Sequence, residues 1–158
     1  MKINPAPKLL IGLGNPDKKY ENTYHNVGFL FTDYLTKNLT SPKFETLNSN
    51  TFMNTSGSFV VKELKKRGLK PEEIIIAHDD SDILLGKYKI SFGRNSAGHK
   101  GIDSVIKILK TKDFWRIRIG VRKPAHLKAG DFVLKKITTT DKKTLEKVFE
   151  EIEKEISL

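Results

Sequence analysis

The sequence predicts an α/β fold, a single-domain three-layer α/β/α sandwich around a twisted, mostly parallel mixed sheet. Short β-branched segments alternate with amphipathic helical segments, which is the pattern of strands joined by crossover helices. The 158 residues suit one domain with a sizeable core, and the sequence contains neither an internal repeat nor a low-complexity linker. We therefore expect one domain over residues 1–158, with a flexible segment at 1–7.

The first predicted strand and helix flank a polar loop. Leu9 to Ile11 form an apolar run typical of a strand that is buried on both faces. After Asn26, a favourable N-cap, apolar residues recur at helical spacing: Val27, Leu30, Phe31, Tyr34 and Leu35. The loop also contains Asn15 and places His25 directly before the helix. Open α/β sheets usually bind ligands at such a strand end.

The stretch from 40 to 68 predicts a short edge strand and then a helix. Phe44 and Leu47 mark the strand, and Met53 and Asn54 lie in the turn before the helix. Apolar residues at helical spacing and a terminal glycine define that helix: Val60, Val61, Leu64 and Gly68.

A central strand follows, formed by the β-branched run from Ile74 to Ile76. We predict that it ends near His78, Asp79 and Asp80. A second polar cluster would then lie at the carboxyl end of a strand, as His25 does.

Two further strands and two helices complete the predicted fold. Residues 87–92 alternate basic and apolar side chains, as a half-exposed strand does. In 114–121 the apolar residues alternate with Arg116 and Arg118, so both arginines emerge on one face. Two apolar stripes indicate the helices: Ile102, Val105, Ile106 and Leu109, and then Leu145, Val148, Phe149 and Ile152.

The chain is strongly basic and has no cysteine. Its 29 Lys and Arg against 19 Asp and Glu give a net charge of +10, which favours a polyanionic partner such as nucleic acid. Without cysteine there is neither a disulfide framework nor a thiolate metal site. No signal peptide or membrane-spanning run is evident. We expect a cytoplasmic, monomeric protein without membrane contact.

The loop residues suggest a hydrolytic chemistry. If His25 and Asp79 meet, the carboxylate would fix the imidazole as a general base. The side-chain amides of Asn15 and Asn54 can donate to a carbonyl oxygen that gains charge. The sequence has no Gly-x-Ser-x-Gly and no cysteine, so water activated by His25 is the simpler nucleophile. We expect no metal, because the acidic cluster at 79–82 lacks a second set of ligands.

Five sequence blocks resemble, in the same order, the signature of bacterial peptidyl-tRNA hydrolases. They are GLGNP at 12–16 with Tyr20 and HNVG at 25–28, TFMNTSG at 51–57, HDDSD at 78–82, GHKGIDS at 98–104, and RIRIG at 116–120. The resemblance implies hydrolysis of the ester that joins a peptide to the 3′ ribose of tRNA, so that the tRNA is reused in translation. It also implies an α/β/α sandwich and a reaction without metal or cofactor.

The resemblance assigns a role to each candidate residue. It implies that His25 is the general base and that Asp79 orients it. It implies tRNA contacts through the acceptor stem and 3′ end, with a phosphate held by Lys89 and Arg118. The residues expected to bind the rest of the substrate are Asn15, Tyr20, Met53, Asn54 and Lys100.

Three departures from the family pattern leave alternatives open. Lys100 replaces the asparagine of the usual Gly-His-Asn-Gly, and an ammonium can donate but cannot accept. Ser91 replaces a second basic residue near Lys89, and about a hairpin's worth of residues is missing before Thr51. One alternative is therefore a non-catalytic, RNA-binding relative. Another alternative, which rests only on the versatility of the fold, is an unrelated nucleoside or phosphate-ester enzyme on a similar sheet.

Overall fold

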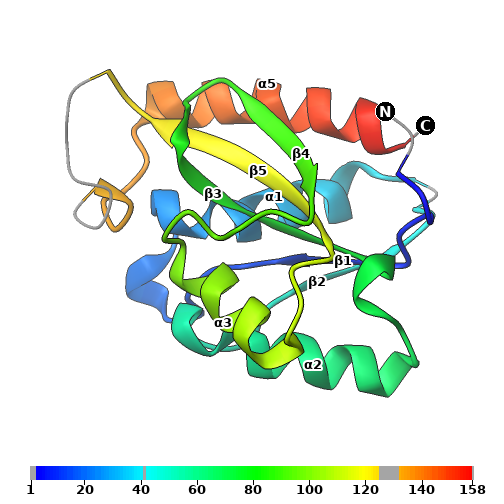
Figure 1. Cartoon of the computed structure of the whole chain (residues 1–158). Helices are drawn as coiled ribbons and strands as arrows, with labels where there is room; N and C mark the ends of the chain where they lie inside the picture. The colour runs from blue at the N-terminus through cyan, green and yellow to red at the C-terminus, as the bar shows by residue number, and fades with distance from the viewer. Residues whose placement is uncertain (1–2, 41, 125–131, 158) are drawn as a thin grey trace.

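A five-stranded mixed sheet forms the centre of the protein (Figure 1). The computed structural model describes residues 3–40, 42–124 and 132–157. The strand order is β2-β1-β3-β5-β4, with β4 antiparallel to β5 and all other neighbours parallel. The strands are β1 (Leu9–Gly12), β2 (Glu45–Asn48), β3 (Ile74–Leu84), β4 (Tyr88–Phe92) and β5 (Trp115–Arg122).

Helices cover both faces of this sheet, which confirms the predicted three-layer sandwich (Figure 1). One face packs against α1 (Val27–Asn38) and α5 (Thr139–Ile156), and the other against α2 (Ser56–Arg67) and α3 (Lys100–Leu109). Two apolar clusters fill the space between the layers. The first includes Leu10, Phe31, Ile75, Ile117 and Phe149, and the second includes Ile11, Val60, Ile76, Ile102 and Val105.

The predicted helix stripes are the buried faces of the observed helices. In α5, for example, Leu145, Val148, Phe149 and Ile152 are all buried. The α2 helix ends at Gly68 as predicted, because this residue adopts a left-handed φ of 63° that favours glycine.

The start of α1 lies directly against the sheet. A Cβ on Gly28 would lie 2.5 Å from the Ala77 carbonyl oxygen and 2.6 Å from that of Leu13, so only glycine fits there. This close approach holds the preceding 3₁₀ turn (Tyr24–Asn26), and with it His25, at the end of β1.

The prediction that the central strand ends near His78, Asp79 and Asp80 is wrong, because β3 continues to Leu84. Pairing with β5 sustains this polar stretch: Asp79 lies opposite Ile119, and Leu84 lies opposite Arg122 after an irregularity. On its other side β3 pairs with β1 only as far as Ala77. Beyond Ala77 the β1 side of β3 is therefore open to loops, and the candidate site lies there.

Arg116 and Arg118 share one face of β5, as their spacing predicts. Both residues are nevertheless buried. Lys89 on β4 lies opposite Arg118 in the antiparallel ladder and is exposed.

The predicted flexible segment 1–7 falls partly outside the described residues, and Ile3 packs against the first apolar cluster. Within the residues that the structure describes, none of the helices has the length and apolar character needed to cross a membrane.

Candidate active site

A cavity of about 680 Å³ opens at the carboxyl end of β1, beside the part of β3 that follows Ala77. The fold thus brings together side chains that lie up to 119 positions apart in the sequence, between Asn15 and Leu134. Among the residues predicted for catalysis and substrate binding, all seven line this cavity: Asn15, Tyr20, His25, Met53, Asn54, Asp79 and Lys100. The cavity wall also includes His99 and the exposed apolar side chains of Phe52 and Leu134.

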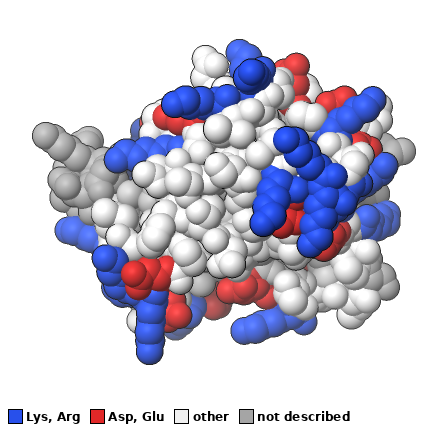
Figure 2. Space-filling model, turned by 90° about the horizontal axis from the view of Figure 1, so that it is seen from below, with Lys and Arg blue, Asp and Glu red and all other residues white. Residues whose placement is uncertain are grey.

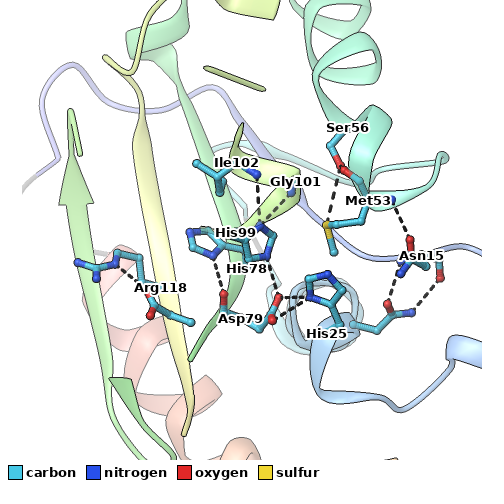
Figure 3. A network of polar contacts seen from close by, with 12 residues as sticks. Asn15, His25, Met53, Ser56, His78, Asp79, His99, Gly101, Ile102 and Arg118 are labelled. Carbon is cyan, nitrogen blue, oxygen red and sulfur yellow. Dashed lines mark hydrogen bonds and ion pairs between the residues drawn. The ribbon is translucent and has the colours of Figure 1, made fainter. Parts of the chain in front are cut away.

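The side chains of His25 and Asp79 are in direct contact, as predicted (Figure 3). The His25 Nδ1 lies 2.9 Å and 3.0 Å from the two carboxylate oxygens. Because an ionised carboxylate only accepts hydrogen bonds, Nδ1 carries the proton. The second ring nitrogen, Nε2, then has a lone pair, and no partner for it is found among residues 3–40, 42–124 and 132–157. His25 thus has the tautomer that a general base requires.

The backbone of His25 is fixed by a distant part of the chain. Its N–H donates to the carbonyl oxygen of Val133 at 2.8 Å, and the neighbouring Tyr24 N–H donates to that of Lys135 at 3.2 Å. Tyr24 also stacks on Phe132, with ring centroids 4.4 Å apart. These contacts hold His25 against the edge of the cavity.

His99 is a second partner of Asp79, and this direct contact was not predicted from the sequence. Its Nε2 lies 2.9 Å from one Asp79 oxygen, while its Nδ1 accepts the backbone N–H groups of Gly101 at 3.1 Å and Ile102 at 3.2 Å (Figure 3). The proton of the ring is therefore on Nε2, and this N–H donates a hydrogen bond to Asp79. His99 also occupies the N-cap of α3. The position of His99 directly before an amphipathic helix is the sequence signal for a capping residue, but nothing in the sequence indicates its contact with Asp79.

The electrostatics of the cluster keep Asp79 ionised. Burial acts to raise the pKa of Asp79, but the neighbouring His25 and His99 outweigh burial and hold this pKa well below the usual carboxyl range. Burial acts to lower the pKa of His25, whereas the charge and hydrogen bond of Asp79 raise it. The positive charge of Lys100 opposes this rise, and the net result is a raised His25 pKa.

Asn15 is held by three hydrogen bonds. The Asn26 Oδ1 accepts the Asn15 N–H at 2.8 Å, and the Asn26 Nδ2 donates to the Asn15 carbonyl at 2.9 Å. The Asn15 Oδ1 accepts the Met53 N–H at 2.8 Å. This last bond orients the amide and leaves its Nδ2 without a partner among the described residues, at the wall of the cavity.

The expected capping role of Asn26 is therefore wrong in one respect. The residue occupies the N-cap position of α1, but its side chain makes no capping hydrogen bond. The reason is that both of its polar atoms bind the backbone of Asn15.

The other predicted substrate residues differ in exposure. Met53 is buried, Tyr20 is half-buried, and Asn54 and Lys100 are exposed. Lys100 is the first residue of α3 and has no ion-pair partner in the part of the chain that the structure describes.

The two residues predicted to hold a tRNA phosphate lie outside the cavity lining. Arg118 is buried, and its Nε donates to the Asp80 carboxylate at 2.9 Å, while one Nη donates to the Ser91 hydroxyl at 3.2 Å. Lys89 is exposed on the neighbouring strand. On the face formed by α2 and α3, the basic side chains lie in separate groups with an uncharged area between them (Figure 2).

His25, Asp79 and His99 have the donor types of a metal site, with their atoms within 4.8 Å of one another. The nitrogens that face Asp79 are nevertheless the protonated ones, and His99 cannot move its proton without losing two amide hydrogen bonds. The donor set therefore fits a hydrogen-bonded triad better than it fits a metal ion.

Comparison with known proteins identifies close relatives. A family model described as Peptidyl-tRNA hydrolase matches residues 9–158. The peptidyl-tRNA hydrolase of Sulfurihydrogenibium sp. is 37% identical over 159 residues, which cover 89% of this chain and 84% of that protein. The peptidyl-tRNA hydrolase of Thermodesulfovibrio yellowstonii is 38% identical over 165 residues, which cover 92% of this chain and 88% of that protein.

Solved structures point to the same family. The crystal structure of peptidyl-tRNA hydrolase from Acinetobacter baumannii has a TM-score of 0.86 and 27% sequence identity, covering 97% of this chain and 88% of that one. A [NiFe] hydrogenase maturation protease from Thermococcus kodakarensis has a TM-score of 0.56 at 13% identity, which shows a shared fold alone.

Proposed function

Because this chain belongs to the peptidyl-tRNA hydrolase family, we propose that it hydrolyses the ester between a peptide and the 3′ ribose of tRNA, with His25 as general base. The observation that supports this role is the contact of Asp79 with His25 Nδ1, which leaves Nε2 as the basic nitrogen beside the cavity.

The proposed reaction begins with a water molecule next to His25. Nε2 takes a proton from this water as its oxygen attacks the ester carbonyl, and the ionised Asp79 stabilises the imidazolium that forms. The tetrahedral intermediate then collapses and its bond to the 3′ ribose oxygen breaks. The imidazolium returns its proton to that oxygen, so the products are a peptide with a free carboxyl group and a tRNA with a free 3′ end.

We propose that three polar side chains at the cavity bind the peptide end of the substrate. We propose that Asn15 donates through its free Nδ2 to the carbonyl oxygen that becomes negative during attack. Asn54 and Lys100 lie at the same cavity and can donate to the peptide or to that oxygen. Tyr20 and Met53 supply wall contacts.

We also propose that Lys89 and Arg118 contact one phosphate of the acceptor region. Lys89 is exposed and lies opposite Arg118 in the ladder, which supports a joint site. Since Arg118 already binds Asp80, a phosphate would share this guanidinium with the carboxylate. Lys89 therefore carries the more available charge. We further propose that the protein acts in the cytoplasm as a monomer, without metal or cofactor.

The central experiment measures release of tRNA from N-acetyl-aminoacyl-tRNA. We expect His25→Ala to lose nearly all turnover, and Asp79→Asn to lose at least about a hundredfold. Asp82→Asn is the matched control, since Asp82 is exposed on the same strand and lies outside the cavity lining. Equal turnover by wild type and His25→Ala would contradict the proposed base. RNA binding by the wild type without turnover would instead support a non-catalytic relative.

A further inference from the structure

The sheet is incomplete beside Asp79, and this leaves a backbone carbonyl that needs a donor. The Leu13 N–H donates to the Ala77 carbonyl at 3.0 Å, and among the described residues this is the last backbone hydrogen bond that β3 receives from the β1 side. Because alternate carbonyls of a strand point to the same side, the next carbonyl on this edge belongs to Asp79. A buried carbonyl without a partner would be costly.

The side chain of His78 supplies the missing donor. Its Nδ1 lies 2.7 Å from the Asp79 carbonyl oxygen, and a carbonyl only accepts, so Nδ1 carries the proton (Figure 3). His78 is 1% exposed. Its imidazole thus takes the place of a strand partner at the residue whose side chain joins His25 and His99.

His78 also packs against the catalytic cluster as a neutral ring. Its ring centroid lies 4.7 Å from that of His99. Burial is the main cause that lowers the pKa of His78, and the nearby His99 and Arg116 add to this effect. Because the ring is neutral and its proton is on Nδ1, His78 is the donor and the Asp79 carbonyl is the acceptor, and this hydrogen bond stays formed at neutral pH.

We propose that His78 is a positioning residue: by binding the Asp79 carbonyl at the open edge of β3, it fixes the Asp79 carboxylate between His25 and His99. The effect on turnover rests on the proposed function, whereas the effect on Asp79 does not. The test must therefore include a measurement on the folded protein that needs no substrate.

His25 reports the position of Asp79 because its pKa depends on that carboxylate. The other charged or titratable groups at the same cavity are Asp80 on β3, His99 and Lys100 at the start of α3, and Tyr20 in the loop of His25. If Asp79 moves away, burial and Lys100 both favour the neutral imidazole, so the pKa of His25 falls.

Two amide variants separate the hydrogen bond from the bulk of the ring. His78→Asn places an amide nitrogen near the position of Nδ1 and keeps the donor, whereas His78→Gln places its amide near the position of Nε2. We expect the His25 titration, followed by NMR, to be unchanged in His78→Asn and shifted to lower pH in His78→Gln. We also expect kcat to fall about tenfold in His78→Gln, with KM changed less than about twofold.

An unchanged His25 titration in His78→Gln would overturn the proposal, and so would equal shifts in both variants. Nitrogen chemical shifts of the wild type give a test that does not depend on either variant folding, because they must show the proton of His78 on Nδ1; a proton on Nε2 would refute the assignment. A wild type without turnover would remove the proposed function and leave the titration result to decide the role of His78.

Discussion

The side chain of Asn26 binds both polar groups of the Asn15 backbone: its Oδ1 accepts the N–H at 2.8 Å, and its Nδ2 donates to the carbonyl at 2.9 Å. This pair joins the loop after β1 to the first turn of α1, and it fixes the residue whose side-chain amide faces the cavity. The orientation of Asn15 therefore depends on a residue that lies outside the cavity lining.

Asn26→Asp tests this relationship with almost no change in shape. The new carboxylate can still accept the Asn15 N–H, but its other oxygen would face the Asn15 carbonyl. We expect a loss of about 1–3 kcal/mol in the free energy of unfolding, measured with urea, together with reduced turnover. Asn50→Ala is the control, because Asn50 is exposed, and it should unfold as the wild type does. Equal stability of Asn26→Asp and wild type would contradict the paired hydrogen bonds.

The pH dependence of kcat/KM should follow the protonation of His25. The base must be neutral, and Asp79 raises its pKa, so activity should rise with pH through a value above that of a free imidazole, about 6.5. In Asp79→Asn the residual activity should have its acid limb at lower pH, because burial and Lys100 then act on His25 without the carboxylate. A limb that stays in place would show that another group titrates.

Lys100 should influence the same limb in the opposite sense. Its charge opposes protonation of His25, so Lys100→Asn should raise the pKa of His25 and move the acid limb to higher pH. Lys100→Arg keeps the charge and should leave the limb near its wild-type position. Kinetic profiles of the two variants at low salt, where screening is weakest, provide the measurement. A similar limb in both variants would exclude a charge effect from this residue.

The buried pair of Asp80 and Arg118 should be important for stability. Asp80→Asn would leave the Arg118 guanidinium without its counterion, and Arg116, whose pKa is lowered to about 10 mainly by burial and then by Arg118, lies nearby. We expect a loss of about 3–5 kcal/mol in the free energy of unfolding. Asp82→Asn, at an exposed position of the same strand, should change the free energy of unfolding by less than about 0.5 kcal/mol. Similar denaturation midpoints for both variants would argue against this pairing.

Gly57 controls the distance between α2 and α3, the two helices that begin shortly after Met53 and His99. A Cβ at this position would lie 2.2 Å from the Ser104 carbonyl oxygen, and the Gly57 N–H donates to the Ser104 hydroxyl at 2.8 Å. Gly57→Ala should therefore separate α2 from α3, lower stability by about 1–3 kcal/mol and reduce turnover. Ser58→Ala, at the exposed neighbouring position, is the control for thermal unfolding and activity. Wild-type behaviour of Gly57→Ala would show that the helices can adjust.

Local patterns predicted most of the fold. The apolar run from Leu9 and the stripe from Val27 correctly predicted a strand and a helix. In each case the spacing of the buried apolar residues determines the type of element. The end of β3 was missed because His78, Asp79 and Asp80 are poor strand formers, and only pairing with β5 keeps them extended.

Those residues of the candidate site that lie in a recognisable sequence motif could be predicted, as for His25 and Asp79. The site was not predictable where the contact depends on strand order. His99 meets Asp79 because α3 begins beside the open edge of β3, and neither the order of the strands nor that edge is visible in the sequence. Period-two spacing correctly predicted that Arg118 shares a face with Arg116. The burial of Arg118 and its bond to Asp80 could not be predicted, because they depend on neighbouring strands.

The double use of the His99 ring limits how this enzyme can be engineered. One nitrogen caps the N-terminus of α3 and the other hydrogen-bonds to Asp79, so a substitution at this position disturbs both a helix terminus and the candidate site. Replacements chosen for a better helix start would lose the bond to the carboxylate, and those chosen for that bond would uncap the helix. A search for thermostable versions should therefore leave position 99 unchanged and look for gains on the outer surfaces of α2 and α5.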